Sequence, residues 1–286
     1  MAKPLAKLIS MLTPKRRWAQ FSLASMFVVV TVLCVSLSVV VNRAHRQRDA
    51  VAAIEALDGT VEYEESDQEA FPRQFLRRWL PRDYFDEVRA VSLAGTPVTD
   101  AGLAHLQGLT GLKTLWLNNT QVTDAGLAHL QGLTRLQVLW LSGPQITDAG
   151  LAHLQGLTGL QELYLGGTHV TDTGLAHLRG LTGLHTLDLT GTQVTDAGLA
   201  HLQGLMGLKI LYLIGTQVTD AGQTHTQKLT RLQELYLMNT QVTDAGLAHL
   251  HGLTALQGLW LSGSQVTGFG LAQLRQALPK CAISGP

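Results

Sequence analysis

Aliphatic residues recur along most of the chain in a unit of 24 residues, which reads L-x-x-L-x-L-x-x-T-x-V-T-D-x-G-L-x-x-L-x-x-L. Within one unit, Leu115 and Leu117 lie two residues apart, which is the period of a β-strand with one buried face. Leu127 and Leu130 lie three residues apart, as on the buried face of a helix. The pattern therefore predicts one short strand and one short helix in each unit.

The units follow one another without insertion. Counting from Val88 gives eight units that end at Pro279, and a further strand is expected around Ile283. One unit carries about seven aliphatic side chains, whose burial stabilises by roughly 10–20 kcal/mol at most, whereas ordering its backbone costs about 24–48 kcal/mol. Because one unit cannot fold alone, we expect an α/β solenoid with nine parallel strands on the concave face and helices on the convex face.

This unit resembles the 24-residue leucine-rich repeats of bacterial proteins, and it is similar to the cysteine-containing subtype of F-box and GALA-type proteins. The sequence LPKCAI at 278–283 resembles the way in which that subtype often ends. The resemblance implies a leucine-rich-repeat solenoid that binds other proteins, and it transfers no catalytic residue. The chain departs from the subtype in lacking an F-box helix set, which argues against a ubiquitin-ligase role, and in its repeat cysteine. Threonine takes the cysteine position at Thr120, Thr168, Thr192, Thr216 and Thr240.

An uncharged apolar run at 21–41 precedes the repeats. A helix of that length at 1.5 Å per residue spans roughly 31 Å, which matches the hydrocarbon core of a membrane. We therefore predict a transmembrane helix that makes the chain a single-pass membrane protein. A secretory signal peptide is the alternative, but its apolar region is about 7–15 residues long and precedes small residues, whereas this run ends in Asn42-Arg43. The flanks of Arg16-Arg17 fit a twin-arginine signal poorly.

Charges on the two sides of the run predict its orientation. Five basic residues precede it and three follow it, so the positive-inside rule favours a cytoplasmic N-terminus and an extracytoplasmic C-terminal domain. The expected order is a basic cytoplasmic stub at 1–20, the span at 21–41, a juxtamembrane collar with an N-terminal cap at 42–87, and the repeat domain at 88–286. This N-terminal arrangement also resembles that of membrane-anchored leucine-rich-repeat proteins of environmental bacteria.

The collar combines a predicted short helix at 48–59 with a stretch at 71–85 that is rich in aromatic and basic residues. A solenoid needs a cap over the open apolar end of its first repeat. Because Tyr84 and Phe85 adjoin the first repeat strand, we expect this stretch to form that cap. A basic amphipathic helix that lies on anionic lipid is the alternative.

An aspartate recurs where each helix of the repeat begins. A side-chain oxygen at this point can cap free N–H groups, and a carboxylate interacts favourably with the helix dipole, so we predict structural helix caps. Calcium binding is the alternative, but successive copies lie on different turns and no turn supplies the several oxygens that calcium needs. The predicted caps are Asp100, Asp124, Asp148, Asp172, Asp196, Asp220 and Asp244, and Gly268 takes this position in the last unit.

The residue between the two strand leucines should point to the concave face, and it is aromatic in six of the eight units. Exposed Trp and Tyr suit interfaces because they offer a large rigid area with a polar tip. We expect this row to bind a partner, and stacking of the rings on one another without a ligand is the alternative. The predicted partner-binding residues are Trp116, Trp140, Tyr164, Asp188, Tyr212, Tyr236 and Trp260.

A protein is the partner that this architecture favours. A glycan or cell-envelope polymer is one alternative, because sugars also pack on Trp and Tyr, and structural self-association at the envelope is another. The 21 basic and 21 acidic residues give no net charge that would favour nucleic acid. No nucleophile elbow, P-loop, HExxH motif or catalytic Cys–His spacing is present, so we expect no enzyme, small-molecule substrate, cofactor or metal. Cys34 and Cys281 are too few for a disulfide framework.

A histidine recurs in the predicted helix of seven of the eight units. Zinc needs its ligands about 2.0–2.1 Å from one ion, whereas adjacent helices of a solenoid are of order 10 Å apart, so metal binding is not expected. A charge response to mild acid is one interpretation, and a surface position copied with its repeat is the other. The row comprises His105, His129, His153, His177, His201, His225 and His249.

Three residues break the repeat. Gln223 and Thr226 occupy positions that hold buried helix leucines in other units. Either this helix is loosened or a water serves the two side chains, because unpaired buried polar groups are costly. Pro144 replaces the recurring threonine and cannot donate a backbone N–H. These positions mark either a bend or recognition site, or drift in a tolerant repeat.

Overall fold

The computed structural model describes residues 23–64 and 81–285. The chain divides into two compact units, Met1–His45 and Arg46–Pro286. The predicted basic stub at 1–20 and the aromatic and basic stretch as far as residue 80 lie outside the described residues.

Helix α2 (Leu23–Glu55) contains most of the apolar run. The part of α2 from Ser25 to Glu55 is long and apolar enough to cross a membrane, with a mean hydropathy of 2.3 in an 18-residue window. A signal sequence would meet the same criterion of length and composition. The large apolar side chains of this window are exposed, with Phe27 at 74%. The span and the short helix predicted at 48–59 belong to one helix, because no glycine or proline interrupts the chain between Phe21 and Gly59.

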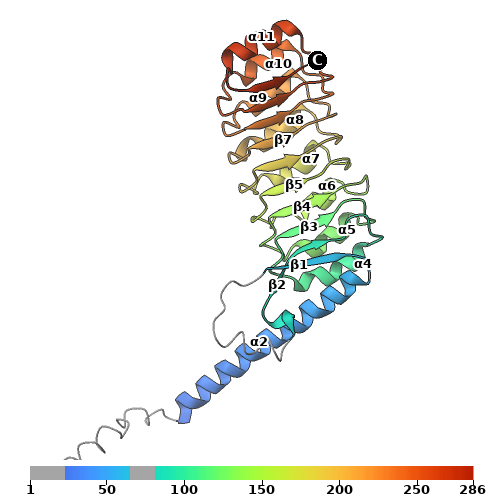
Figure 1. The fold of residues 1–286 in the computed structure, drawn as a ribbon, viewed down its shortest axis with the longest axis vertical. Helices are drawn as coiled ribbons and strands as arrows, with labels where there is room; N and C mark the ends of the chain where they lie inside the picture. The colour runs from blue at the N-terminus through green and yellow to red at the C-terminus, as the bar shows by residue number, and fades with distance from the viewer. Residues whose placement is uncertain (1–22, 65–80, 286) are drawn as a thin grey trace, which may run out of the picture. The chain divides into compact units, whose positions relative to one another are not determined.

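Ten strands form one sheet in chain order (Figure 1). The first strand pairs antiparallel with the second, and all later neighbours pair parallel. The nine parallel strands match the number expected from eight repeats and one closing strand. The strands are β1 (Thr60–Glu64), β2 (Glu87–Ser92), β3 (Thr114–Leu117), β4 (Val138–Leu141), β5 (Glu162–Tyr164), β6 (Thr186–Asp188), β7 (Ile210–Tyr212), β8 (Glu234–Tyr236), β9 (Gly258–Trp260) and β10 (Ala282–Ser284).

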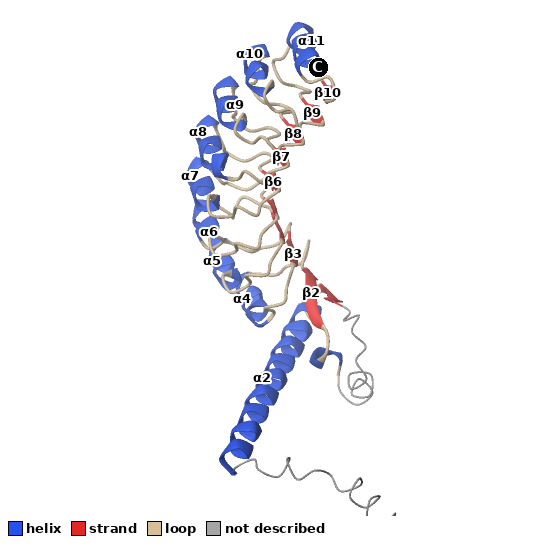
Figure 2. Ribbon diagram, turned by 90° about the vertical axis from the view of Figure 1, so that its left-hand side faces the viewer, coloured by secondary structure: helices blue, strands red, loops and turns tan. Residues whose placement is uncertain are grey.

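Within Arg46–Pro286, short helices lie on the side of the repeats opposite to the strands (Figure 2). In most repeats one α-helical turn leads into a short 3-10 segment. The α-helices are α4 (Asp100–Leu103), α5 (Asp124–Leu127), α6 (Asp148–Ala152), α7 (Asp172–Leu175), α8 (Asp196–Leu199), α9 (Asp220–Thr226), α10 (Asp244–Leu247) and α11 (Gly268–Ala277). The 3-10 segments are η1 (Arg82–Tyr84), η2 (Ala104–Gly108), η3 (Ala128–Leu130), η4 (Ala176–Leu178), η5 (Ala200–Gly204) and η6 (Ala248–Leu250).

One hydrophobic core runs through the stacked repeats. In the second repeat, Leu115 of the strand and Leu127, Leu130 and Leu133 of the helical side are all 0% exposed. The two periods found in the sequence thus bring their leucines to the same interior. Each repeat buries its apolar faces against its neighbours. This shared burial is needed because the side chains of one repeat alone do not offset the entropy cost of ordering its backbone.

A tight turn follows each strand and explains two recurring residues. The turn needs a positive φ, which glycine and asparagine adopt most readily, as Gly167 (φ 70°) and Asn119 (φ 58°) do. The threonine after it is buried, and at Thr168 the hydroxyl donates to the carbonyl of Leu165 at 2.7 Å. Pro144 has neither donor, and the preceding Gly143 has a φ of 105°.

The open end of the first repeat is covered by chain that lies outside the repeat pattern. Ala50, Val51 and Ile54 of α2 are buried in the common core, and β1 adds an antiparallel strand to the sheet. Gln47 is 5% exposed, and its amide donates to the carbonyl of Asp86 at 2.8 Å. These contacts shield the apolar face that β2 would otherwise expose, as a solenoid requires.

Candidate binding face

The strands bring seven predicted partner-binding residues into one line. The residue between the two leucines at each inner strand pairs in register with its counterpart on the next strand, from Trp116 to Trp260. This alignment follows from the fixed 24-residue length, since one extra residue would turn a side chain to the other face. We refer to this line as the concave row: Trp116, Trp140, Tyr164, Asp188, Tyr212, Tyr236 and Trp260.

The rings of the concave row form two stacked groups. Trp140 and Tyr164 stack with their ring centroids 3.9 Å apart. Tyr212 stacks on Tyr236 at 4.3 Å, and Tyr236 stacks on Trp260 at 4.0 Å with the ring planes within 1°. Stacking fixes the ring orientations, yet Trp140 is still 37% exposed. The two interpretations of the sequence are therefore compatible, because stacked rings can still offer their outer surface to a ligand.

Two tyrosines of the row are held by glutamates two residues earlier on the same strand. The hydroxyl of Tyr164 donates to Oε2 of Glu162 at 2.9 Å, and that of Tyr236 donates to Oε2 of Glu234 at 2.8 Å. Burial, and then the hydrogen bond to the glutamate, raises the pKa of both phenols above the usual 10.0. At neutral pH both rings are therefore uncharged, and both hydroxyl hydrogens are directed to carboxylates.

Asp188 separates the two stacked groups. It lies between Tyr164 and Tyr212 in the register of the sheet. Its Oδ1 accepts a hydrogen bond from the backbone N–H of Thr190 at 2.9 Å, and Gly166, in the turn after the neighbouring strand β5, leaves room for its Oδ2. The row therefore contains a fixed carboxylate with a tyrosine on each side.

The recurring aspartates join successive repeats instead of capping their own helices. Oδ1 of Asp100 accepts the backbone N–H of Thr123 at 2.7 Å, and Oδ2 accepts its hydroxyl at 2.7 Å. The N-cap of the next helix is Thr123 itself, whose hydroxyl oxygen accepts from the N–H of Ala125. The same joint recurs from each aspartate to the threonine 23 residues later. The threonine, and not the carboxylate, is thus the N-cap of each helix, while the aspartates keep the predicted place in the first turn of their own helices. These aspartates are Asp100, Asp124, Asp148, Asp172, Asp196, Asp220 and Asp244.

A glycine completes each joint. A Cβ atom at Gly126 would meet Oδ1 of Asp100, and the corresponding glycines of later repeats stand in the same relation to the preceding aspartate. The D-x-G part of the repeat is therefore a contact between turns, with the glycine leaving space for the carboxylate. At the last joint, hydrogen bonds from the hydroxyl and backbone N–H of Thr267 lower the pKa of Asp244.

The histidines also connect successive repeats, on the helical side. Nδ1 of His129 lies 2.7 Å from Nε2 of Gln107, and Nδ1 of His153 lies 2.8 Å from Nε2 of Gln131. At His201 the preceding repeat supplies the guanidinium of Arg179 instead of an amide. Burial, and then the charge of Arg179, lowers the pKa of His201. In the described part of the chain, no three or more His, Cys, Asp or Glu residues form a group suited to a metal ion.

The repeat with Gln223 and Thr226 buries both polar side chains, at 0% and 1% exposure. The hydroxyl of Thr226 donates to the backbone carbonyl and to the side-chain oxygen of Gln223, at 2.9 and 3.0 Å. Nε2 of Gln223 has no hydrogen-bond partner among the described residues. The α-helix of this repeat, α9, spans seven residues, whereas the neighbouring α-helices α8 and α10 span four each.

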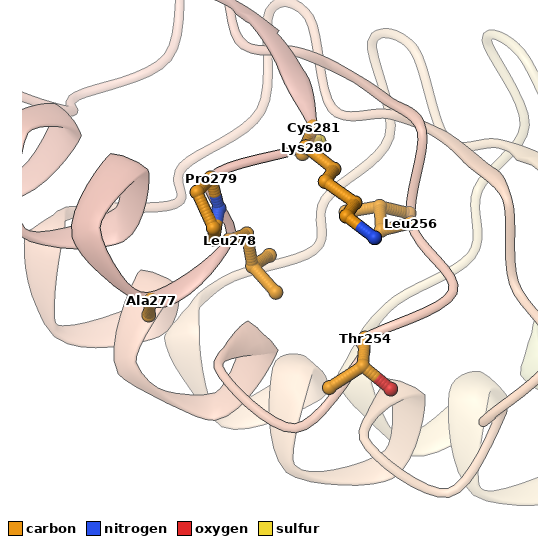
Figure 3. A pocket seen from close by; sticks show the side chains of 7 residues that line it. All are labelled: Thr254, Leu256, Ala277, Leu278, Pro279, Lys280 and Cys281. Carbon is orange, nitrogen blue, oxygen red and sulfur yellow. The ribbon is translucent and has the colours of Figure 1, made fainter.

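Two hollows lie away from the concave row, since no residue of the row lines either. One of about 420 Å³ lies beside Asp49 and His105 near the first repeat. The other, of about 230 Å³, lies beyond the end of α11 (Figure 3). Its lining residues are Thr254, Leu256, Ala277, Leu278, Pro279, Lys280 and Cys281. Burial raises the pKa of the Cys281 thiol, so this thiol has little nucleophilic character at neutral pH.

Comparisons with known proteins agree with this architecture. The family model described as "Leucine Rich repeats (2 copies)" matches residues 110–156, and the model described as "Leucine Rich repeat" matches residues 181–202. Among solved structures, the chain is similar to internalin C2 from Listeria monocytogenes, with 28% sequence identity and a TM-score of 0.54. That similarity covers 69% of this chain and 81% of internalin C2. Comparison with curated proteins gave no match. The chain thus contains leucine-rich repeats arranged in a parallel-stranded α/β solenoid.

Proposed function

We propose that the chain is a membrane-anchored interaction scaffold or receptor that binds a protein partner on its concave face. The observation that carries the proposal is the concave row, in which half-exposed aromatic rings stand in register on consecutive parallel strands. Solenoids of this kind use their extended inner surfaces for binding. Trp and Tyr are enriched among the residues that dominate the affinity of protein interfaces.

The stacking of the rings favours binding for an energetic reason. Ordering a side chain at an interface costs about 0.5–1.5 kcal/mol when that side chain is free beforehand. Tyr236 is already held between Tyr212 and Trp260 and is bonded to Glu234. A partner that packs on these rings therefore meets a surface that is largely ordered in advance.

A capture experiment tests the proposal with the full chain in lipid nanodiscs. Trp116, Trp140, Tyr212 and Trp260 are changed together to alanine, and a matched variant carries alanine at His129 and His153 on the helical side. We expect the wild type and the histidine variant to capture a protein that the concave variant does not capture. That protein, once purified, should bind the wild type directly. Capture by all three forms would refute the proposal.

Two other outcomes would assign the face differently. A glycan-array signal that disappears in the concave variant, with no protein captured, would indicate a polymer of the cell envelope. Self-association in analytical ultracentrifugation that disappears in the same variant would indicate a structural role. We propose no catalytic activity, cofactor or resident metal, in keeping with leucine-rich repeats as binding scaffolds.

We further propose that 21–41 spans the membrane, with the N-terminus in the cytoplasm and the repeats outside it. Support comes from the exposed apolar surface of α2 and from the excess of basic residues before the run. Ser262 is exposed, so Ser262→Cys in a background with Cys34→Ser and Cys281→Ser gives one accessible thiol. We expect a membrane-impermeant maleimide to label it in intact cells, and labelling only after lysis would reverse the orientation. Relation to the GALA-type subtype is likewise a proposal, based on the repeat and on 278–283.

A further inference from the structure

The interval in the concave row around Asp188 has the width of one additional stacked group. Neighbouring strands lie about 4.8 Å apart, so the two strands that carry Tyr164 and Tyr212 lie roughly 10 Å apart. The stacked rings on either side are spaced by 3.9 to 4.3 Å. One flat group can therefore continue the stack across Asp188 where the chain supplies no ring.

The charge around this interval is negative. The inward positions of the ten described strands carry the carboxylates of Glu62, Glu162, Asp188 and Glu234 and no lysine, arginine or histidine. Lys113, at the edge of the sheet, forms an ion pair with Glu64 at 2.7 Å. Lys209 directly precedes β7. A cation from a partner would thus meet Asp188, with Glu162 on the neighbouring strand and Glu234 two strands away on the other side.

The rings of Tyr164 and Tyr212 are the second feature of this interval that favours a cation. Burial raises the pKa of Tyr164 and Tyr212, and nearby carboxylates contribute in the same direction. Both phenols therefore stay neutral, so their rings keep the electron-rich faces that attract cations. A guanidinium group is planar, stacks on aromatic faces and donates paired hydrogen bonds to a carboxylate. A lysine ammonium meets the carboxylate but is not planar.

We propose that the concave face recognises an arginine side chain of its protein partner, with the guanidinium against the rings of Tyr164 and Tyr212 and its N–H groups on the Asp188 carboxylate. This inference rests on the proposed protein-binding function and specifies the partner as basic. The partner segment then crosses the concave row at its centre, with the stacked group of Tyr212, Tyr236 and Trp260 on one side and that of Trp140 and Tyr164 on the other.

The test uses the full chain in nanodiscs and short capped Gly-Ser peptides with one central residue. Arginine, citrulline, lysine and phenylalanine are compared at that position by NMR shifts of the tyrosine rings and by fluorescence titration. Citrulline keeps the shape of arginine without its charge. We expect the arginine peptide to bind about tenfold more tightly than the citrulline peptide, with lysine between them, and to shift Tyr164 and Tyr212.

Matched variants separate this site from general charge attraction. Asp188→Asn keeps an oxygen that can accept from Thr190, and it should weaken the arginine peptide about tenfold. Glu55→Gln removes the same charge from an exposed position on α2 and should change nothing. Equal binding of arginine and citrulline, or wild-type affinity in Asp188→Asn, would overturn the inference. Tightest binding of the phenylalanine peptide would also overturn it, by assigning the interval to an aromatic ring.

The inference and the proposed function can fail separately. If the concave alanine variant loses its captured protein while no peptide discriminates arginine, the binding face stands and the arginine site is wrong. If that variant captures the same proteins as the wild type, the proposed function fails, whatever the peptides show.

Discussion

Replacement of Gln223 by leucine should stabilise the protein. The side chain is 0% exposed, and its Nε2 has no hydrogen-bond partner among the described residues. Its Oε1 accepts a hydrogen bond from the hydroxyl of Thr226, and the same hydroxyl also donates to the backbone carbonyl of Gln223. The matching position in the preceding repeat holds Leu199, which is 1% exposed. The glutamine therefore keeps an amide away from water at a place where the repeat accommodates an aliphatic side chain.

The expected size follows from two contributions. A buried donor that is left unpaired costs about 1–3 kcal/mol, and burial of a leucine side chain contributes about 1.5–3 kcal/mol. Since the aliphatic part of Gln223 is already buried, the two do not add in full, and we expect the free energy of unfolding to rise by about 2–4 kcal/mol. The hydroxyl of Thr226 keeps the backbone carbonyl of residue 223 as its acceptor.

Urea unfolding of the full chain in detergent micelles measures the change, and hydrogen exchange of α9 locates it. Leu199→Gln is the matched control, because it places the same amide one repeat earlier and should lower the unfolding midpoint. Thr226→Leu alone should raise the free energy of unfolding by less than Gln223→Leu, since it removes the donor to Oε1 of Gln223. An unchanged or lower midpoint for Gln223→Leu would refute the reasoning and indicate a bound water that satisfies the amide.

Three further substitutions test other contacts in the repeat domain. Arg179→Gln restores the residue of neighbouring repeats and should partly raise the pKa of His201 in an NMR titration; an unchanged pKa would assign the shift to burial alone. Because the pKa of His201 in the folded protein is lowered below the unfolded value near 6.5, its contribution to stability is full above that value and declines as the pH falls towards the folded pKa. In Arg179→Gln, the free energy of unfolding should fall less over this pH range. Gly174→Ala should lower the free energy of unfolding by about 1–3 kcal/mol because its methyl group meets Asp148, and adding Asp148→Ala should cost less than the sum of the two single changes; strict additivity would contradict the contact. Pro144→Thr should raise the thermal midpoint, since the new N–H and hydroxyl can each donate to the carbonyl of Leu141 for about 0.5–1.5 kcal/mol; a lower midpoint would mean that the turn is adapted to proline.

The strands could be predicted from the sequence because their alternation is local. Leu115 and Leu117 identify the buried face, and the residue between them must then face inward. The way in which the rings lie on this face could not be predicted. The stacking of Tyr236 depends on Tyr212 and Trp260, each 24 residues away in sequence, and on Glu234 two residues earlier.

The aspartates show where a local pattern misleads. Thr123-Asp124 has the composition of a helix N-terminus whether the carboxylate bonds to its own helix or to the next repeat. Gly126 is the residue that indicates the contact with the preceding repeat, because glycine inside a helix is unfavourable unless another group needs the space. The sequence predicts two helices where the structure has the single helix α2, because a change from apolar to polar residues resembles a boundary although no helix-breaking residue occurs there.

The joint between repeats also bears on how such a chain grows. Since every link runs from a carboxylate to the threonine and glycine of the following copy, duplication of one whole unit reproduces all the contacts that it needs at both junctions. Lengthening the coil therefore requires no compensating substitution, as long as the inserted segment is a complete copy. In the last unit the carboxylate is missing, because Gly268 takes its position.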